Sequence, residues 1–230
     1  EGDILGFAGV GGNVQEDLCE ALAGSLRLAS GDIRLVGSSI SSLDTLEIRR
    51  AGLALITDDR MGKGLAPDRS IVENCMAGHH KFGKFGKWLI KDTDARSFTE
   101  SIVADYDVRC GKNIKTAVRA LSGGNMQKLL VGREIAYEPV VLVAAQPTAG
   151  VDVAARKLIH DSFRRLVKTG SGVILISGDL EEIMGLANRI IVLYRGRAVT
   201  EMTHPHYDPT EISYYMTGIR GAQDDRYSHS

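Results

Sequence analysis

Short, almost purely apolar runs recur along the sequence, each bounded by residues that favour turns. Runs of this length and composition are typical of strands buried on both faces, as in a parallel sheet. They occupy residues 4–9, 53–57, 140–145, 172–177 and 189–194. Helical patterns lie between them, over residues 15–24, 125–137, 153–169 and 180–187. This alternation predicts an α/β fold with a mostly parallel sheet flanked by helices.

Two regions depart from the alternation. Residues 31–36 and 195–201 are predicted to form edge hairpin strands, the second after the turn at Arg195 and Gly196. Residues 68–136 lack a convincing central strand and are mostly helical in pattern, which predicts a helical subdomain inserted into a domain of residues 1–218. Residues 219–230 form a polar tail.

Composition narrows the class of protein. A chain of 230 residues can bury a core as one domain with a subdomain. Its net charge of -1 shows no overall excess of positive charge, which argues against nucleic acid as the main partner. No apolar run approaches the roughly 20 residues that span a bilayer. Cys19, Cys75 and Cys110 are scattered, so we expect no metal cluster and cysteines that serve as small apolar residues in a reducing compartment.

The glycines after the first strand occupy the place of a phosphate-binding loop, which normally ends in lysine followed by serine or threonine. Here Gln15, Glu16 and Asp17 stand at that end. Asn13 and Glu16 have the spacing of a capping box, and both carboxylates lie where the helix dipole favours negative charge. In one interpretation the carboxylates replace phosphate electrostatically and hold the loop together without nucleotide. In the other they are ordinary solvated residues at a helix start.

A second glycine-containing turn, LSGGNMQK, covers residues 121–128. Ser122, Gly123 and Gly124 lie just before a predicted helix, where a small hydroxyl and exposed N–H groups can bind an anion. An ordinary serine N-cap with glycines in its turn fits these residues equally well.

The wider sequence around this turn resembles a known family. LSGGNMQKLLVGREI (121–135) resembles the signature helix of ATP-binding cassette (ABC) domains, with Asn125 as the variant usual in sugar and nucleoside importers. Matching segments at 1–13, 144–152, 177–197 and 210–218 follow in the family's order. The chain is most similar to the second of two fused cassettes in importers paired with basic-membrane-lipoprotein-type binding proteins. The resemblance implies a P-loop NTPase-like sheet, with some antiparallel N-terminal strands missing.

The resemblance also implies where the phosphate chemistry would lie. Gly9 and Gly12 match the phosphate loop, with Asn13 beside them, while Gln15 replaces the lysine and Glu16 a hydroxyl residue. A carboxylate about 4 Å from a phosphate charge costs about 4 kcal/mol at an effective dielectric constant near 20. We therefore expect this loop to bind Mg-ATP weakly.

Two further positions lack the family's catalytic groups. Gln146 stands where a glutamate would polarise the attacking water, and Gly178 where a switch histidine would contact the γ-phosphate. Phosphoryl transfer depends on positioning and on charge stabilisation, so the isolated chain is expected to be weakly active or inactive as an ATPase.

In this family cassettes pair head to tail, so the resemblance implies that the signature contacts ATP that is bound to a partner cassette. That set is Ser122, Gly123, Gly124, Asn125 and Gln127, with Asp152 supporting the shared interface. The implied partners are a second cassette fused upstream that holds most of the ATP and Mg²⁺, transmembrane permease subunits and, indirectly, a periplasmic or lipoprotein solute-binding protein. The implied location is the cytoplasmic face of the membrane, as a peripheral protein. Because the sequence lacks an initiating Met, we expect a piece of a longer polypeptide.

Three local motifs have simpler interpretations. The basic, aromatic segment 78–91 is predicted first of all to be a solvated loop with anchoring aromatics. The second interpretation is a docking site for the membrane partner. We expect the histidines at 79, 80, 204 and 206 to lie on the surface. Asp58, Asp59 and Arg60 are expected to form a turn with a local ion pair and no metal site.

Two other classes of protein remain as alternatives. An independently active soluble ABC ATPase would need a lysine in the phosphate loop and a carboxylate after residues 140–144, and the sequence has neither. A dinucleotide-binding oxidoreductase is suggested by glycines 9, 11 and 12, but Val14 occupies the third glycine position of that fingerprint. Binding of ATP or of NAD discriminates between these classes.

Overall fold

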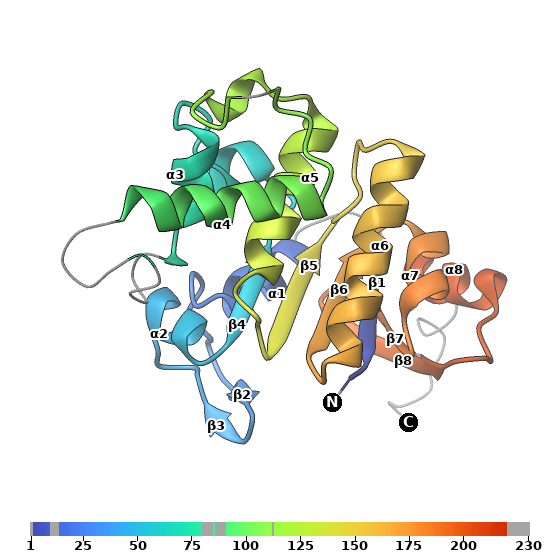
Figure 1. Ribbon diagram of the computed structural model, residues 1–230. Helices are drawn as coiled ribbons and strands as arrows, with labels where there is room; N and C mark the ends of the chain where they lie inside the picture. The colour runs from blue at the N-terminus through green and yellow to red at the C-terminus, as the bar shows by residue number, and fades with distance from the viewer. Residues whose placement is uncertain (1, 10–13, 80–84, 86–90, 112, 220–230) are drawn as a thin grey trace, which may run out of the picture. The chain divides into compact units, whose positions relative to one another are not determined.

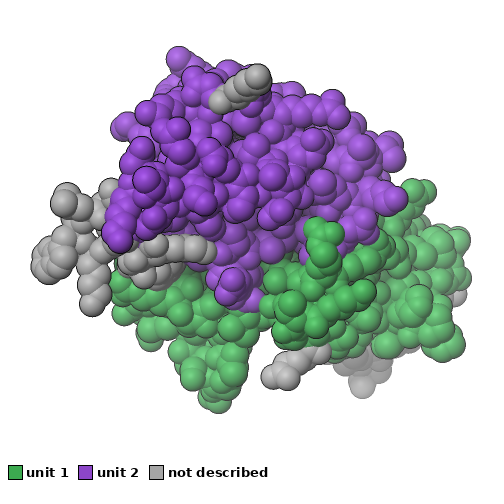
Figure 2. Space-filling view, viewed as in Figure 1, with its two compact units in different colours: residues 1–55, 140–146, 164–230 green, residues 56–139, 147–163 purple. Residues whose placement is uncertain are grey.

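The computed structural model describes residues 2–9, 14–79, 85, 91–111 and 113–219 (Figure 1). The chain divides into two compact units, shown in two colours in Figure 2. Unit 1 comprises Glu1–Leu55, Val140–Gln146 and Arg164–Ser230, and unit 2 comprises Ile56–Pro139 and Pro147–Phe163. The predicted subdomain boundary at 68–136 stays a prediction.

A six-stranded sheet forms the centre of unit 1, in the order β4-β5-β6-β1-β7-β8. Its strands are β1 (Ile4–Ala8), β4 (Leu53–Ile56), β5 (Val141–Ala145), β6 (Gly172–Ser177), β7 (Arg189–Tyr194) and β8 (Arg197–Thr203). β1 pairs in parallel with β6 and β7, and β5 pairs in parallel with β6. β8 pairs antiparallel with β7 across the turn at Arg195 and Gly196. The mostly parallel sheet and its antiparallel edge strand at 195–201 are thus confirmed.

Among its described residues, unit 1 contains α1 (Val14–Leu22), α2 (Thr45–Arg50), the end of α6 (Val153–Lys168), α7 (Leu180–Leu186) and α8 (Pro209–Thr217). α1 packs against β5, α7 against β1 and β6, and α8 against β7. β1 and α7 approach closely at Gly6, where an added Cβ would lie 2.7 Å from Ile183 Cγ2. A glycine is required there because any side chain would separate the helix from the sheet.

Helix α2 was not predicted from the sequence. A capping box begins it, in which Glu47 N donates to Asp44 Oδ1 over 2.8 Å and Asp44 N donates to Glu47 Oε2 over 2.9 Å. That reciprocal pair, three residues apart, is the signal that could have located the helix start.

The hairpin strand predicted at 31–36 is present but does not join the edge of the large sheet. β2 (Arg34–Leu35) pairs with β3 (Ser38–Ser39) in a separate two-stranded sheet. Val36 and Gly37 have φ values of 49° and 79°, so the chain reverses within two residues and the strand pairs with its own continuation.

Asp32 stabilises this hairpin in a pH-dependent way. Its carboxylate accepts hydrogen bonds from Ser39 Oγ, from Arg34 Nε over 2.8 Å and from Ser41 Oγ over 2.9 Å. These bonds, that from Ser39 foremost, lower the pKa of Asp32 from 3.8 to about 2. A lowered carboxyl pKa contributes stability that is complete above the unfolded pKa and is lost as the pH falls through the folded pKa.

We therefore expect Asp32→Asn to lower the melting temperature at neutral pH, and this difference to shrink between the pKa values of 3.8 and about 2. Thermal unfolding at a series of pH values measures it. Asp105→Asn, at an exposed position at the end of α4, is the matched control. A difference for Asp32→Asn that stayed constant with pH would contradict the expectation.

Unit 2 is mainly helical. It contains η1 (Arg60–Gly64), α3 (Ile71–Met76), α4 (Asp92–Asp105), η3 (Val118–Ala120), α5 (Gly123–Ile135) and the first part of α6 (Val153–Lys168). α4 packs against both α3 and α5. Between positions 68 and 136, the described residues form no strand beyond one isolated bridge, Ser70 with Ala117.

An aromatic cluster lies inside unit 2 and corrects the prediction for His79, which is only 2% exposed. Its ring stacks on Tyr137 at 3.7 Å and meets the edge of Phe98 at 4.8 Å. A flat imidazole fills this aromatic space, and its Nε2 lies 3.3 Å from the Arg133 carbonyl oxygen. Phe85 is also buried, as expected of an anchoring aromatic. The rest of the basic segment at 80–84 and 86–90 lies outside the described residues.

The thiols follow the predicted pattern in part. Cys19 and Cys75 are buried and Cys110 is half-buried. Burial raises the pKa of the Cys75 thiol to about 12, which keeps it protonated and unreactive. Among the described residues, no helix has the length and apolar character that crossing a bilayer requires.

Candidate functional site

Three positions predicted for phosphate chemistry follow neighbouring strands in unit 1. Gly9 follows β1, Gln146 follows β5 and Gly178 follows β6. Because β5, β6 and β1 are adjacent and parallel, their carboxyl ends meet at one edge of the sheet, where α/β proteins bind ligands. The topology therefore brings these three positions together.

The Gln15 side chain forms a hydrogen bond with the backbone at this edge of the sheet. Its Nε2 donates to the Gly9 carbonyl oxygen over 3.2 Å, and a Cβ added to Gly9 would lie 3.1 Å from the same nitrogen. Glu16 is exposed in the first turn of α1. Gly12 and Asn13 lie outside the described residues, so the proposed capping box with Glu16 stays a prediction.

Gln146 and Gly178 lie side by side. A Cβ added to Gly178 would lie 3.5 Å from Gln146 Nε2. The polar residues that flank Gly178 hold α7: Asp179 caps the helix, and Ser177 Oγ donates to Glu182 Oε2 over 2.7 Å. Gln15 and Gln146 contribute amides and the two glycines contribute no side chain, so none of these four positions carries a charge for a phosphate.

The tip of α5, in unit 2, has a different chemistry. Ser122 is the N-cap, and its Oγ accepts from Asn125 N over 3.4 Å and from Asn125 Nδ2 over 2.9 Å. Asn125 Oδ1 in turn accepts from Arg109 N over 2.9 Å. The Arg109 N–H fixes which end of the amide is the oxygen, so Asn125 presents its NH₂ group to Ser122.

This arrangement determines what Ser122 can do. A hydroxyl has two acceptor lone pairs and one donor hydrogen, and Asn125 occupies both acceptor positions. The Ser122 hydrogen is therefore left to donate to another acceptor, at the same helix tip as the N–H groups of the first turn. Oriented donors of this kind bind an anion.

Gln127 and Lys128 fasten α5 within unit 2. Gln127 is 2% exposed and its Nε2 donates to the Pro147 carbonyl oxygen over 2.8 Å. Lys128 is also buried, and its Nζ donates to the carbonyl oxygen of Asp107 and, over 3.2 Å, to its Oδ2. Gln127 was placed with the residues that face a partner's ATP, but its side chain points inward and holds the helix against the loop after β5.

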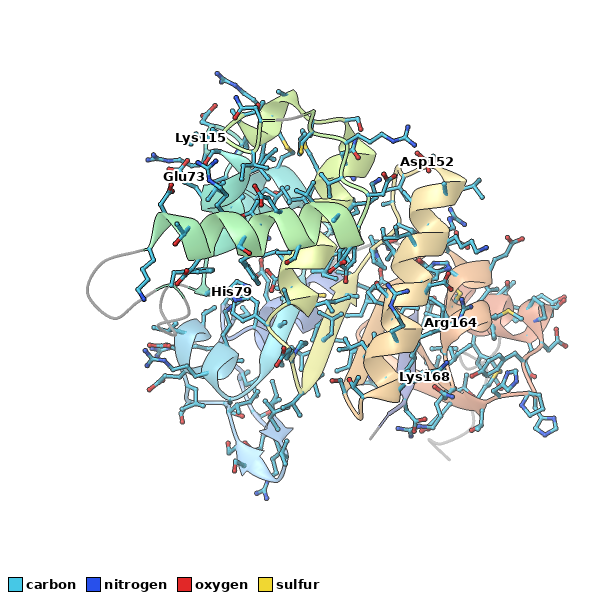
Figure 3. The ribbon with its side chains drawn as sticks, in the orientation of Figure 1. Glu73, His79, Lys115, Asp152, Arg164 and Lys168 are labelled. Carbon is cyan, nitrogen blue, oxygen red and sulfur yellow. The ribbon has the colours of Figure 1, made fainter. Side chains whose placement is uncertain are left out.

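A cavity of about 250 Å³ lies beside this tip, with Ser122, Gly124, Asn125, Arg109, Lys128 and Asp152 in its lining. Asp152 precedes α6, whose start it caps by accepting from Ala155 N over 2.8 Å (Figure 3). The structure therefore brings four of the predicted signature and loop residues to one cavity. No group of three or more His, Cys, Asp or Glu side chains suited to a metal occurs within the described ranges.

Arg60 is a residue whose position the sequence analysis did not foresee. Arg60 does not form the expected ion pair with Asp58 or Asp59, all three of which are described. Asp59 Oδ1 instead accepts from Gly62 N over 2.8 Å, which shapes the turn of η1. Arg60 Nη1 donates to the Ala149 carbonyl oxygen over 3.2 Å. No local pattern indicates a contact between segments so far apart in the chain.

Known proteins similar to this chain identify its family. The glucose import ATP-binding protein TsgD13 of Haloferax volcanii is 36% identical over 94% of this chain. The guanosine import ATP-binding protein NupO of Bacillus subtilis is 37% identical, also over 94% of the chain. The chain belongs to the ATP-binding cassette family. It spans 40% and 42% of the length of these two curated relatives. No protein-family model matches the cassette.

Solved structures show the same fold. A dimeric ATP-binding cassette in a post-hydrolysis state, bound to ADP and phosphate, superposes with a TM-score of 0.78. It is 18% identical, and the match covers 90% of this cassette and 88% of that chain. The ADP conformation of another ABC transporter cassette gives a TM-score of 0.73 at 18% identity, over 99% of this cassette and 89% of that chain. The predicted P-loop NTPase-like fold class is thus confirmed.

Proposed function

We propose that this cassette is the ATP-binding part of an importer for a sugar or a nucleoside, and that it presents its signature tip to ATP held by a second cassette. The two relatives described above are named as glucose and guanosine import ATP-binding proteins, and these names support the two solute classes. The dimeric neighbour bound to ADP and phosphate supports a pair of cassettes as the working unit.

One contrast carries the proposal. The α5 tip has an oriented serine hydroxyl with helix N–H groups beside it, whereas the strand ends of unit 1 have lost their charged groups. A tip that can bind phosphate and a loop that binds it poorly fit a cassette that works on nucleotide from a partner.

The residues of this cassette then have separate tasks. Ser122 donates to a phosphate oxygen, Asn125 orients Ser122, and Gln127 and Lys128 hold the helix that carries them. Mg-ATP, bound mainly by the partner, supplies the phosphoryl group. Asp152, at the start of α6 and in the lining of the same cavity, shapes the loop that meets the partner.

The remaining partners follow from an importer. The partner cassette precedes this one in the same polypeptide, permease subunits cross the membrane, and a solute-binding protein delivers the solute to them. The cassette is peripheral, on the cytoplasmic face of the membrane. The residues that select the solute belong to the permease and the binding protein.

The test compares the isolated cassette with the assembled importer. Calorimetry on the isolated chain is expected to give weak binding of Mg-ATP and no binding of NAD, and hydrolysis is expected only after assembly with the partner cassette. An isolated chain that turned over Mg-ATP at about 1–1000 per second, the ordinary range of enzymes, would show a self-sufficient ATPase and overturn the proposal. Tight binding of NAD would instead indicate an oxidoreductase.

A further inference from the structure

The Arg60 guanidinium lies beside two glycines within unit 2. A Cβ added to Gly123, in the α5 tip, would lie 3.4 Å from Arg60 Nη2, and one added to Gly150 would lie 3.5 Å from the same atom. Arg60 Nη1 donates to the carbonyl oxygen of Ala149, the residue before Gly150. The guanidinium therefore lies between the signature tip and the loop that leads to Asp152.

The charge of Arg60 is not neutralised by its neighbours. A guanidinium has five N–H donors, and over the described part of the chain the Ala149 carbonyl is its one hydrogen-bond acceptor. No described carboxylate lies within ion-pair distance of it. Asp58 and Asp59 direct their oxygens to backbone N–H groups of their own turn. Arg60 is only half-buried, so part of this residue is accessible to solvent.

The other charges at the tip offset one another. Lys128 Nζ and Arg109 Nε lie 3.2 Å and 3.7 Å from Asp107 Oδ2, and Asp152 adds a second carboxylate to the cavity lining. Ser122 and the helix N–H groups are neutral donors. A nucleotide that reached this tip without Arg60 would meet no net positive charge, although its phosphates carry several negative charges.

We propose that Arg60 is a phosphate-binding residue of the signature face, which adds a cation to the neutral donors of the α5 tip. This proposal rests on the proposed function, because it concerns the same nucleotide. Arginine suits the task, since its planar fork can bond two phosphate oxygens while one nitrogen remains on Ala149. The absence of side chains at Gly123 and Gly150 leaves the space that the guanidinium needs.

The test measures kcat and KM for Mg-ATP in the assembled importer. Arg60→Gln keeps an amide donor for the Ala149 carbonyl but removes the charge. It is expected to lower kcat/KM about tenfold, a typical effect of one charge-assisted hydrogen bond. The deficit is expected to shrink to about threefold when the ionic strength rises to about 0.5 M, because salt screens partly exposed charges. Arg60→Lys is expected to restore most of the activity.

Arg69→Gln is the matched control, because this arginine is exposed in the same unit and pairs with Glu73 over 3.4 Å. It is expected to match the wild type. Equal activity of Arg60→Gln and wild type would overturn the proposal. So would a loss in both Arg60 variants that is unchanged by salt, since that result indicates a tether to Ala149 without a role for charge. Ser122→Ala separates the two proposals. If Ser122→Ala keeps full activity, the proposed function is overturned. If Ser122→Ala loses activity while Arg60→Gln keeps it, only the role of Arg60 is overturned.

Discussion

Ser122→Arg is expected to abolish ATP hydrolysis by the importer assembly proposed above, with a loss of at least about a hundredfold in kcat, the scale of removing one oriented transition-state donor. The change removes the hydroxyl whose oxygen accepts both hydrogen bonds from Asn125 and whose hydrogen is left to donate. It also places a long side chain in a cavity of about 250 Å³ beside the tip. Steady-state release of phosphate at saturating Mg-ATP measures the effect.

Two controls make this result specific. Gln15→Ala is expected to leave hydrolysis nearly unchanged, because within the described part of the chain Gln15 bonds the Gly9 carbonyl alone, and it carries no charge. Ser38→Arg adds the same side chain at an exposed position on β3, which belongs to unit 1 and not to the unit that carries the signature tip, and is expected to behave as wild type. Equal losses for Ser122→Arg and Gln15→Ala would mean that the cassette's own loop takes part in hydrolysis, against the proposed division of labour.

Arg133→Met is expected to lower the free energy of unfolding by about 3–5 kcal/mol, the range for removing one partner of a buried ion pair. The side chains of Arg133 and Glu134 are 9% and 1% exposed, and Arg133 Nη2 lies 2.8 Å from Glu134 Oε1. The same nitrogen donates to the Gly64 carbonyl oxygen over 2.7 Å. The substitution removes the Arg133 cation from beside a buried carboxylate and a donor from the buried Gly64 carbonyl. Urea unfolding measures the loss.

A surface pair supplies the comparison. Arg189 and Glu201 are also 2.8 Å apart, but their side chains are 49% and 50% exposed. Arg189→Met is therefore expected to cost less than about 1 kcal/mol. The double variant Arg133→Met with Glu134→Leu is expected to recover part of the loss, because it also removes the buried Glu134 carboxylate. The recovery is incomplete because the Gly64 carbonyl still lacks the Arg133 donor. A loss below 1 kcal/mol for Arg133→Met would contradict the role assigned to this buried pair.

Prediction from sequence succeeded where burial creates a repeating pattern. β5 and β6 are covered on both faces, so nearly every residue is apolar and the strands are visible as unbroken runs. It failed where the pattern is too short or the decisive contact is remote. α2 has six residues and one buried side chain, Ile48, which gives no readable period. The sequence around His79 does not indicate that it is buried, because the rings that cover it, Tyr137 and Phe98, come from distant positions in the chain.

The sequence by itself determined the chemistry that is available: an α/β alternation, a serine and two glycines before a helix, the uncharged Gln15 after the first glycine loop, and the uncharged Gln146 and Gly178 at strand ends. Only the tertiary structure decided which groups meet. Arg60 contacts Ala149 across 89 positions of sequence, and Asn125 takes its orientation from the N–H of Arg109. Local periodicity encodes which side of an element is buried, because burial repeats with the helix or strand period. A hydrogen bond between distant segments depends on the path of the whole chain, so it has no local period.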